Sequence, residues 1–294
     1  MSFTDKFFKK RGASLFAAGF LAALSFTATD AYALNAPHIL APHESSYSVR
    51  MTDRNSASPL VSINGEMSYH LDDTCDGWTV SQSFSLNYLY SNQRGFSEKK
   101  HFTNWEAKDG SGFQFASKSM VNGELSDEFR GSATQINGNG NGHAEFQVPE
   151  GLSFDFEQKT LFPNQYILEL LKRAEKGEKF YNMVWFDGAD ESGLVEVNTF
   201  IGDELTKEEM IALRLKLAKN PEIAAEMLTE RAWRMRLAFF PLSQNDDTEG
   251  GTPSHEMDVI LHDNGIVSEA AVHFGSFTIL ETLKSLGPKK KNDC

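Results

Sequence analysis

The chain has 294 residues, a net charge of −13 at pH 7 and a hydrophobic content of 40%. The acidic balance argues against nucleic-acid binding, which needs a basic surface, and against electrostatic attachment of the protein to anionic lipid. The length fits one large β domain or two small ones, and 23 phenylalanines supply enough apolar area for a sizeable core.

The N-terminus has the three parts of a secretory signal. Four basic residues lie within positions 6–11, an apolar stretch covers positions 15–28, and Ala31-Tyr32-Ala33 is an A-x-A cleavage site. An uncleaved anchor helix is the alternative, but the apolar run is short for a membrane span. We therefore predict a signal peptide over residues 1–33, cleaved after Ala33, and a periplasmic protein that does not span the membrane.

Most of the remaining chain shows the alternation of apolar and polar residues that is typical of β-strands. Residues 34–45 form an irregular lead, and residues 46–294 are expected to form one domain. The alternation is clearest at Phe84, Leu86, Tyr88 and Tyr90, which predicts a strand with one buried face. Further strands are predicted over residues 100–108, 113–121, 125–136, 143–148, 180–186, 194–201, 235–240, 256–262, 266–274 and 278–286. Asn-Gly and Asp-Gly pairs between them predict tight antiparallel turns.

Two helical segments interrupt the strands. Pro163 can occupy the first turn of a helix that ends at Gly177, with apolar residues at helical spacing between them. The expected role of this helix is to cover the open face of a bent sheet. Residues 204–233 read as a helical insertion: Thr206 and Glu209 form a capping box, and Pro221 is expected to open a second helix. This insertion either packs on the surface or serves as a partner-binding arm.

The chain contains two cysteines, Cys75 and Cys294. In an oxidising compartment two exported thiols are expected to be paired, either within one chain or between two chains. Two cysteines without a histidine cluster make a poor zinc site, and their separation excludes a CxxC redox motif.

No catalytic or metal-binding signature is found in the sequence. Zinc spacings, a G-x-S-x-G elbow and a glycine-rich phosphate loop are missing, and the Asn/Gly run at residues 137–142 lacks the carboxylates of a calcium loop. Carboxylate pairs for hydrolysis remain open, because the separation they need is spatial. We expect no enzymatic activity, no cofactor and no metal.

Several local patterns occur in an order that resembles the EipB family of periplasmic cell-envelope integrity proteins of alphaproteobacteria. They are CDGW at 75–78, NWEAKDG at 104–110, TLFP at 160–163, VWFDG at 184–188, DNGIV at 263–267 and the terminal Cys294. The resemblance covers nearly the whole chain after the signal. It implies a long, bent antiparallel sheet wound into a β-spiral, similar to lipoprotein-carrier folds, with a packed helix. It also implies a disulfide between Cys75 and Cys294.

The leading functional hypothesis is a non-enzymatic protein that maintains the cell envelope by binding a periplasmic protein, such as a helical-repeat protein, or an amphipathic lipid or peptide. The alternatives are a dedicated lipid or lipoprotein carrier and an envelope hydrolase that uses acidic residues. A concave aromatic groove is expected to hold the ligand, unless these side chains simply fill the core. Its candidate residues are Phe84, Tyr88, Trp105, Phe113 and Phe115.

Overall fold

The computed structural model describes residues 39–290 except residues 57, 137–140, 157–159 and 243–250. The described residues all belong to one compact unit, His38–Cys294. The predicted signal peptide and Cys294 lie outside the described residues. No helix in the described ranges is long and apolar enough to cross a bilayer.

The described strands form one sheet of fifteen, which confirms the mainly β prediction. Only the short β9 pairs in parallel with its neighbour, and every other pairing is antiparallel. The bounds are β1 His43–Arg54, β2 Leu60–Asp73, β3 Gly77–Tyr90, β4 Gly95–Ala107, β5 Gly112–Val121, β6 Glu124–Gln135, β7 Gly142–Val148, β8 Ser153–Phe156, β9 Thr160–Leu161, β10 Phe180–Phe186, β11 Leu194–Glu204, β12 Ala232–Pro241, β13 His255–His262, β14 Val267–His273 and β15 Phe277–Pro288.

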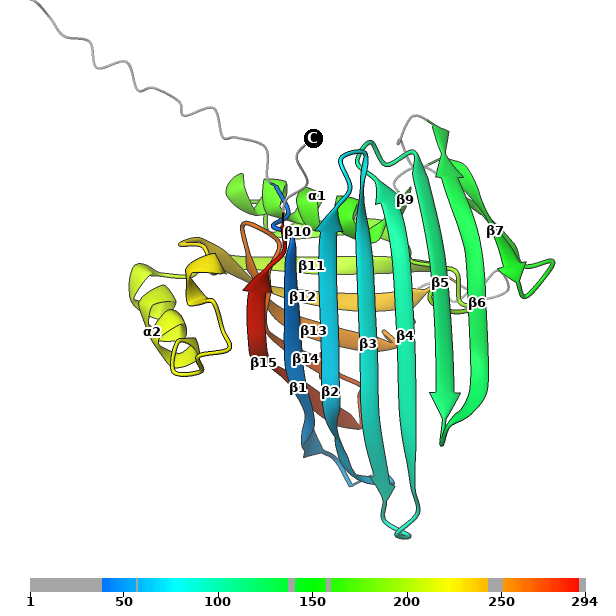
Figure 1. Cartoon of the computed structure of the whole chain (residues 1–294), viewed down its shortest axis with the longest axis horizontal. Coiled ribbons are helices and arrows are strands. Elements are labelled where there is room, and N and C mark those ends of the chain that lie inside the picture. The colour runs from blue at the N-terminus through cyan, green and yellow to red at the C-terminus, as the bar shows by residue number, and fades with distance from the viewer. Residues whose placement is uncertain (1–38, 57, 137–140, 157–159, 243–250, 291–294) are drawn as a thin grey trace, which may run out of the picture. The chain divides into compact units, whose positions relative to one another are not determined.

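The strand order follows the chain around a nearly closed ring. Neighbouring strands in the sheet are neighbours in sequence, and β1 pairs with β15, so the first and last strands meet. The two free edges are β8 and β9, which are also consecutive in the chain. In Figure 1, β15 and β1–β7 form a front layer whose strands cross β10–β14, the back layer. The sheet therefore encloses its core, and among the described strands the break in the ring falls between β8 and β9.

Turn chemistry sets the strand register. Asn122 and Gly123 join β5 to β6 with backbone φ values of 52° and 88°, as a two-residue hairpin loop with both central residues at positive φ requires. Gly110 and Gly265, the glycines of the Asp109-Gly110 and Asn264-Gly265 pairs between predicted strands, also have positive φ. The tight-turn predictions at these three sites are confirmed.

Helix α1, Pro163–Glu175, packs between the two layers at one end of the sheet (Figure 1). Tyr166, Leu170 and Leu171 are buried against β10–β13, while Ile167 also contacts a small cluster of apolar residues on β2 and β3. The N-cap residue of α1 offers no side-chain acceptor. Glu106 of β4 supplies the hydrogen-bond acceptor for the helix N-terminus instead.

The Glu106 carboxylate is fully buried and accepts the backbone N–H groups of Asn164 and Gln165, at 2.8 and 2.7 Å. These two donors belong to the first turn of the helix, which has no partners of its own for them. Burial raises the pKa of Glu106 to about 7, and the two N–H donors oppose that rise. One side chain of the front layer thus fixes the N-terminus of α1.

Phenylalanine side chains pack across the break between β8 and β9. Phe154 and Phe156 of β8 contact Phe186 of β10, with ring centroids 6.3 and 4.9 Å apart, and Phe113 stacks on Phe162 at 4.8 Å. All five lie in a buried cluster between β5–β8 and β10. Apolar packing therefore joins the two layers at the point where backbone pairing of the sheet ends.

Two glycines next to β10 and β11 make room for this cluster. Gly188 and Gly193 both have positive φ, and a Cβ on either would overlap the ring of Phe115 or Phe154 respectively. Any other residue at either position would adopt an unfavourable positive φ, and its Cβ would displace a core ring.

The insertion between β11 and β12 holds one α-helix, so the prediction of a second helix from Pro221 is wrong. The α-helix is α2, Lys207–Leu217, with the predicted capping box, and a single 3₁₀ turn, η2 Ala225–Met227, follows it. The backbone of Glu222 and Ala224 bonds to Leu286 of β15 at 2.9 Å each. Ile223 and Leu228 are buried against β1, β2 and β15. Pairing with the sheet and side-chain burial replace the helical hydrogen bonds.

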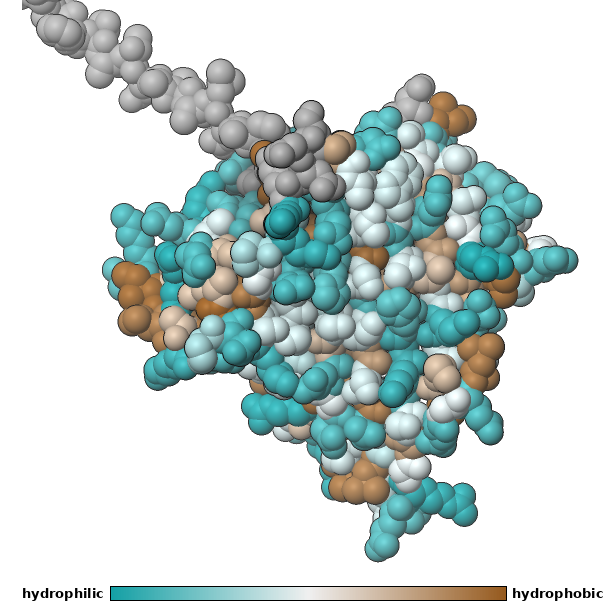
Figure 2. Space-filling model, in the orientation of Figure 1, coloured by the Kyte–Doolittle hydropathy of each residue, from teal (hydrophilic) through white to brown (hydrophobic). Residues whose placement is uncertain are grey.

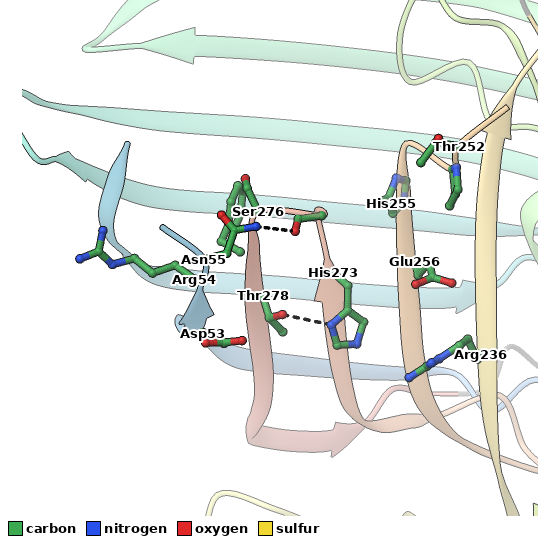
Figure 3. A pocket seen from close by; sticks show the side chains of 13 residues that line it. Asp53, Arg54, Asn55, Arg236, Thr252, His255, Glu256, His273, Ser276 and Thr278 are labelled. Carbon is green, nitrogen blue, oxygen red and sulfur yellow. Dashed lines mark hydrogen bonds between the residues drawn. The ribbon is translucent and has the colours of Figure 1, made fainter. Parts of the chain in front are cut away.

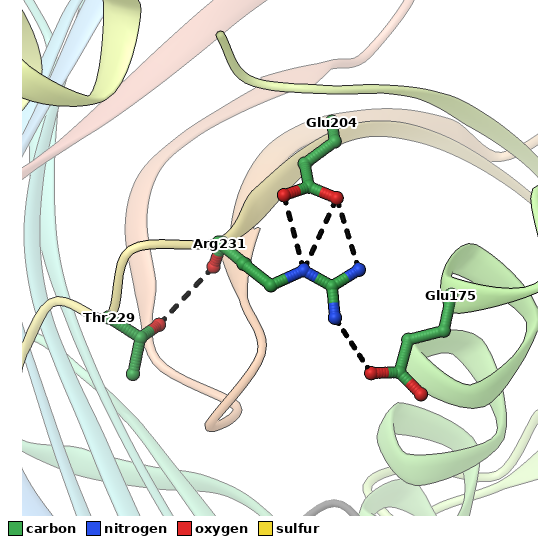
Figure 4. A network of polar contacts seen from close by, with 4 residues as sticks. All are labelled: Glu175, Glu204, Thr229 and Arg231. Carbon is green, nitrogen blue, oxygen red and sulfur yellow. Dashed lines mark hydrogen bonds and ion pairs between the residues drawn. The ribbon is translucent and has the colours of Figure 1, made fainter. Parts of the chain in front are cut away.

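Arg231 fixes the base of this insertion (Figure 4). Its guanidinium donates to Glu204 at the end of β11, at 3.1–3.3 Å, and to Glu175 at the end of α1, at 2.9 Å. The same group lies over the ring of Trp233, 4.9 Å from its centroid. The two ends of the insertion are thus held together and tied to α1.

Substitution of Phe186 by alanine is expected to lower the free energy of unfolding by about 3–5 kcal/mol, because it opens a cavity in the cluster that joins β8 to β10. Urea unfolding followed by tryptophan fluorescence measures the change. Phe180→Ala, at an exposed site on the same strand, should cost less than about 0.5 kcal/mol. Equal losses in the two variants would contradict the proposed role of the cluster.

Candidate functional site

The structure does not bring the five predicted groove residues to one surface. Phe113 and Phe115 are 1% and 3% exposed and belong to the core cluster at the break in the sheet. Trp105 points to the opposite face of β4 from Glu106 and donates to Thr74 at 3.3 Å. The placement of Phe113 and Phe115 agrees with the alternative that these aromatics fill the core, whereas Trp105 lies on the other face of the sheet.

Phe84 and Tyr88 do face the inside of the sheet and are half-buried. Tyr88 stacks on Phe96 at 4.4 Å and donates to Glu98 at 2.8 Å. Burial and the adjacent Glu98 raise the pKa of the Tyr88 hydroxyl well above its ordinary value. This part of the predicted groove combines apolar rings with a polar pair.

Two polar groups inside the sheet are poorly matched to their surroundings. The indole N–H of Trp185 on β10 is buried and has no hydrogen-bond partner in the described part of the chain. Glu281 of β15 lies opposite Val49 and Ala270 in the strand register, and burial raises its pKa to about 7. A buried donor without an acceptor costs free energy unless water or a ligand satisfies it.

A larger hollow lies on the outer face of the back layer. We call it the outer groove; its volume is about 1020 Å³. Phe180 and Phe200, paired across β10 and β11, form one part of its lining, with ring centroids 5.3 Å apart. They are 76% and 47% exposed. The two rings contact each other and still leave apolar surface exposed to solvent.

Charged pairs line the rest of the outer groove. Arg236 and Asp258 make a two-pronged ion pair with both N–O distances at 2.6 Å, and Arg234 pairs with Glu209 of α2 at 3.0 Å. Arg236 lowers the pKa of the Asp258 carboxyl below its usual range. The groove thus offers aromatic rings beside arginines whose positions are already fixed.

A second pocket of about 390 Å³ opens at the rim, where Arg236 is shared with the outer groove. Its walls come from the end of β1, the start of β13 and the β14–β15 turn (Figure 3). His255 stacks on Phe239 at 4.3 Å and on Phe274 at 5.7 Å. The pocket therefore has an aromatic side and a polar side.

On its polar side, Thr278 and His273 form a row with the carboxylate of Asp258, which lines the outer groove. Thr278 contacts Nδ1 of His273 at 3.1 Å, as Figure 3 shows, and Nε2 of His273 contacts Asp258 at 3.1 Å. Hydrolase triads use the same groups, but they also need an oxyanion site and a nucleophile presented to substrate. Here the hydroxyl lies within β15 and the carboxylate is already bound by Arg236. The row reads as a cross-strand polar network that stabilises the sheet.

No group of three potential metal ligands occurs among the described residues. Acidic residues in two turns have local roles: Asp73 accepts the Cys75 N–H at 2.9 Å and pairs with Lys108 at 2.7 Å, while Asp187 accepts the Ala189 N–H at 2.9 Å. Burial raises the pKa of Asp187 to about 6.

These features define a nearly closed, antiparallel barrel-like sheet with a helix between its layers. The chain belongs to the EipB-like family, whose sequence profile matches residues 34–290, so the resemblance drawn from the motifs is confirmed. The cell envelope integrity protein EipB of Brucella abortus is 25% identical over 248 residues, 84% of each chain. A crystal structure from Brucella abortus, described as a β-barrel-like protein of domain of unknown function DUF1849, has a TM-score of 0.71 at 24% identity. The structural match covers 86% of this chain and 99% of the Brucella abortus chain.

Sequence reasoning missed the outer groove. The sequence predicts strands that contain Phe180 and Phe200, but only the cross-strand register places the two side chains next to each other on the outer face. The alternation did carry a usable signal, because Phe180 and Phe200 stand on the faces of their strands opposite the buried Met183 and Val197. An aromatic residue on the polar face of a strand is the signal that marks such a surface.

Substitution of Glu281 by glutamine should change how stability depends on pH. A carboxyl whose folded pKa lies near 7 is protonated in the native state while the unfolded chain has already ionised, so the wild type loses stability between about pH 4.5 and 7. The free energy of unfolding of the wild type should therefore fall relative to Glu281→Gln, by about 1–3 kcal/mol across this window. Urea titrations at pH 5, 6, 7 and 8 measure it. A constant difference between the two proteins would contradict the burial of this carboxyl.

Proposed function

We propose that this protein is a non-enzymatic periplasmic protein that maintains the integrity of the cell envelope by binding a protein partner at the outer groove. Family membership and the name of the Brucella abortus relative support the envelope role. The secretory pattern of residues 1–33 supports the compartment. The exposed pair Phe180 and Phe200 carries the assignment of the binding surface.

The composition of the outer groove favours a protein partner. Aromatic and arginine side chains dominate the binding energy of protein interfaces, and buried charges there need partners. Phe180 and Phe200 supply aromatic area, while Arg236 already has its carboxylate at 2.6 Å and needs no new counter-ion. An incoming apolar side chain between the rings and Ile260 would bury surface without stranding a charge.

Binding of an amphipathic ligand inside the sheet is the second candidate. One observation favours it: the indole N–H of Trp185, which a ligand carbonyl or carboxylate would satisfy. Half-buried Phe84 and Tyr88 would then contact an apolar chain. A carrier of lipids or lipoproteins would use this inner surface and leave the outer groove free.

Phe180→Ala combined with Phe200→Ala should remove function while leaving the fold intact. A strain without the gene is expected to be sensitive to detergents and to wall-active antibiotics, and the wild-type gene should restore growth. The double variant should fail to restore it at equal protein abundance, because the partner loses its aromatic contact.

The matched control is Leu125→Ala, which removes another exposed apolar side chain from β6 of the front layer. It should restore growth fully. Full restoration by the Phe180 and Phe200 double variant would show that the outer groove is not the binding surface.

We further propose that a disulfide joins Cys75 to Cys294. The last described residues run close to the turn that carries Cys75: Lys289 donates to Pro42 through its backbone at 3.2 Å and to Asp72 through Nζ at 2.7 Å. Five further residues can span at most about 17 Å, which suffices to reach a turn next to Asp72. The disulfide would close the long loop from Cys75 to Cys294, and in the chain-entropy model closing a loop of that length adds about 5 kcal/mol to the free energy of unfolding.

Intact mass of exported protein, measured before and after reduction, tests this bond. An unreduced monomer should be about 2 Da lighter than the reduced chain and should resist alkylation. Cys75→Ser should expose the Cys294 thiol to alkylation and lower the unfolding midpoint. A disulfide-linked dimer, or two free thiols in the exported protein, would contradict the pairing.

A further inference from the structure

A row of short hydroxyl side chains crosses the outer face of the front layer. The strand register places Ser285, Ser46, Ser68 and Ser83 opposite one another on β15, β1, β2 and β3. The same row continues into His101 on β4 and Lys118 on β5. At about 4.8 Å between strands, the six positions extend over about 24 Å.

Hydrogen bonds run along this row. The hydroxyls of Ser46 and Ser285 are 2.6 Å apart, and the hydroxyl of Ser83 contacts Nδ1 of His101 at 2.7 Å. A second row beside it contains Ser48, Glu66, Ser85 and Lys99 in register. We call these two rows the serine shelf.

The serine shelf is hollow because its central side chains are short. A space of about 480 Å³ lies over it, floored by serines of β1–β3 and walled by long side chains of β4 and β5. Figure 2 views this face, where pale, weakly hydrophilic residues lie among strongly hydrophilic ones. Serine is a weaker strand former than the β-branched residues, so stability of the sheet does not account for serine at these outward positions.

The charge of the walls is opposite to that of the whole chain. Lys99, His101 and Lys118 stand together on the β4–β5 side, in a chain with a net charge of −13. Lys99 has no ion-pair partner among the residues that the structure describes. Lys118 approaches Glu128 only at 3.7 Å, and Glu66, the carboxylate on the shelf itself, is paired with Lys284.

We propose that the serine shelf binds an anionic polysaccharide that lies across the strands. Hydroxyl side chains both donate and accept hydrogen bonds, as sugar hydroxyls require, and Lys99 and Lys118 would contact the acidic groups of the polymer. The hollow runs across several strands and is open, which suits an extended polymer. This surface is on the front layer, away from the outer groove, so the inference is independent of the proposed partner.

The first test uses hyaluronate, a polysaccharide with one carboxylate per repeat, with neutral dextran and inorganic polyphosphate as comparison polymers. Fluorescence anisotropy of labelled polymer at low ionic strength should detect binding of hyaluronate, weaker binding of dextran, and loss of hyaluronate binding as salt rises. Lys99→Gln with Lys118→Gln should reduce the affinity about tenfold, because each lysine contacts an anionic group. Lys172→Gln, on the exposed face of α1, should leave it unchanged.

The second test separates the hydroxyl floor from the charged wall. Ser68→Val with Ser85→Val fills the shelf and removes two hydroxyls, yet valine suits a strand, so the unfolding midpoint should be retained or rise. Hyaluronate affinity should fall about tenfold, whereas Ser132→Val, at an exposed site on β6, should not change it. Failure of hyaluronate to bind, or equal hyaluronate affinity in the valine variant and the wild type, would overturn the proposal. It would also be overturned if polyphosphate bound as tightly as hyaluronate and the valine changes left the polyphosphate affinity unchanged.

Discussion

Apolar packing across one break in the sheet governs the architecture of this protein. Among the described residues, backbone hydrogen bonds connect fifteen strands from β8 around to β9, but they do not join β8 to β9. Phe154, Phe156 and Phe186 meet across that gap, and Gly188 and Gly193 leave room for the neighbouring rings. A sheet edge without a partner invites pairing with another chain, so side-chain packing here also protects two short edges.

Because the sheet is nearly closed, its inner surface is separated from its outward faces. The aromatic cluster and α1 fill the volume between the layers at one end, and the half-buried Phe84 and Tyr88 pack against a separate cluster on β1, β2 and β15. The outward faces remain accessible and differ in character. The back layer presents Phe180 and Phe200 among fixed ion pairs, and the front layer presents serines beside Lys99. The two proposed ligands, a protein and a polysaccharide, would therefore bind on different layers.

The sequence was sufficient for most strands, the turns and α1, because each depends on local pattern and backbone chemistry. The short strands β8 and β9 were not predicted. Asn122-Gly123 specifies a hairpin, and Pro163 and Gly177 mark the limits of a helix. The segment after Pro221 shows the limit of such reasoning: its composition permits a helix, but Ile223 is buried against the sheet and its neighbours bond to Leu286. Long-range contacts of this kind have no local signature.

The candidate site was less predictable for the same reason. Alternation identified Phe113 and Phe115 as inward-facing, but could not distinguish a filled core from an open groove, which depends on what crosses from the other layer. The side chain of Trp105 lies on the outer face of β4, because successive side chains of the strand alternate and that of the neighbouring Glu106 points inward. Phe180 and Phe200 become a surface only through the register of β10 and β11.

Site-specific photo-crosslinking in living cells distinguishes an outer binding surface from an inner one. A photoreactive phenylalanine analogue at position 200 places the probe on the outer face, and the same analogue at position 84 places it inside the sheet. Binding at the outer groove predicts a discrete protein adduct from position 200 and no protein adduct from position 84. A protein or lipid adduct from position 84, with no adduct from position 200, would contradict it.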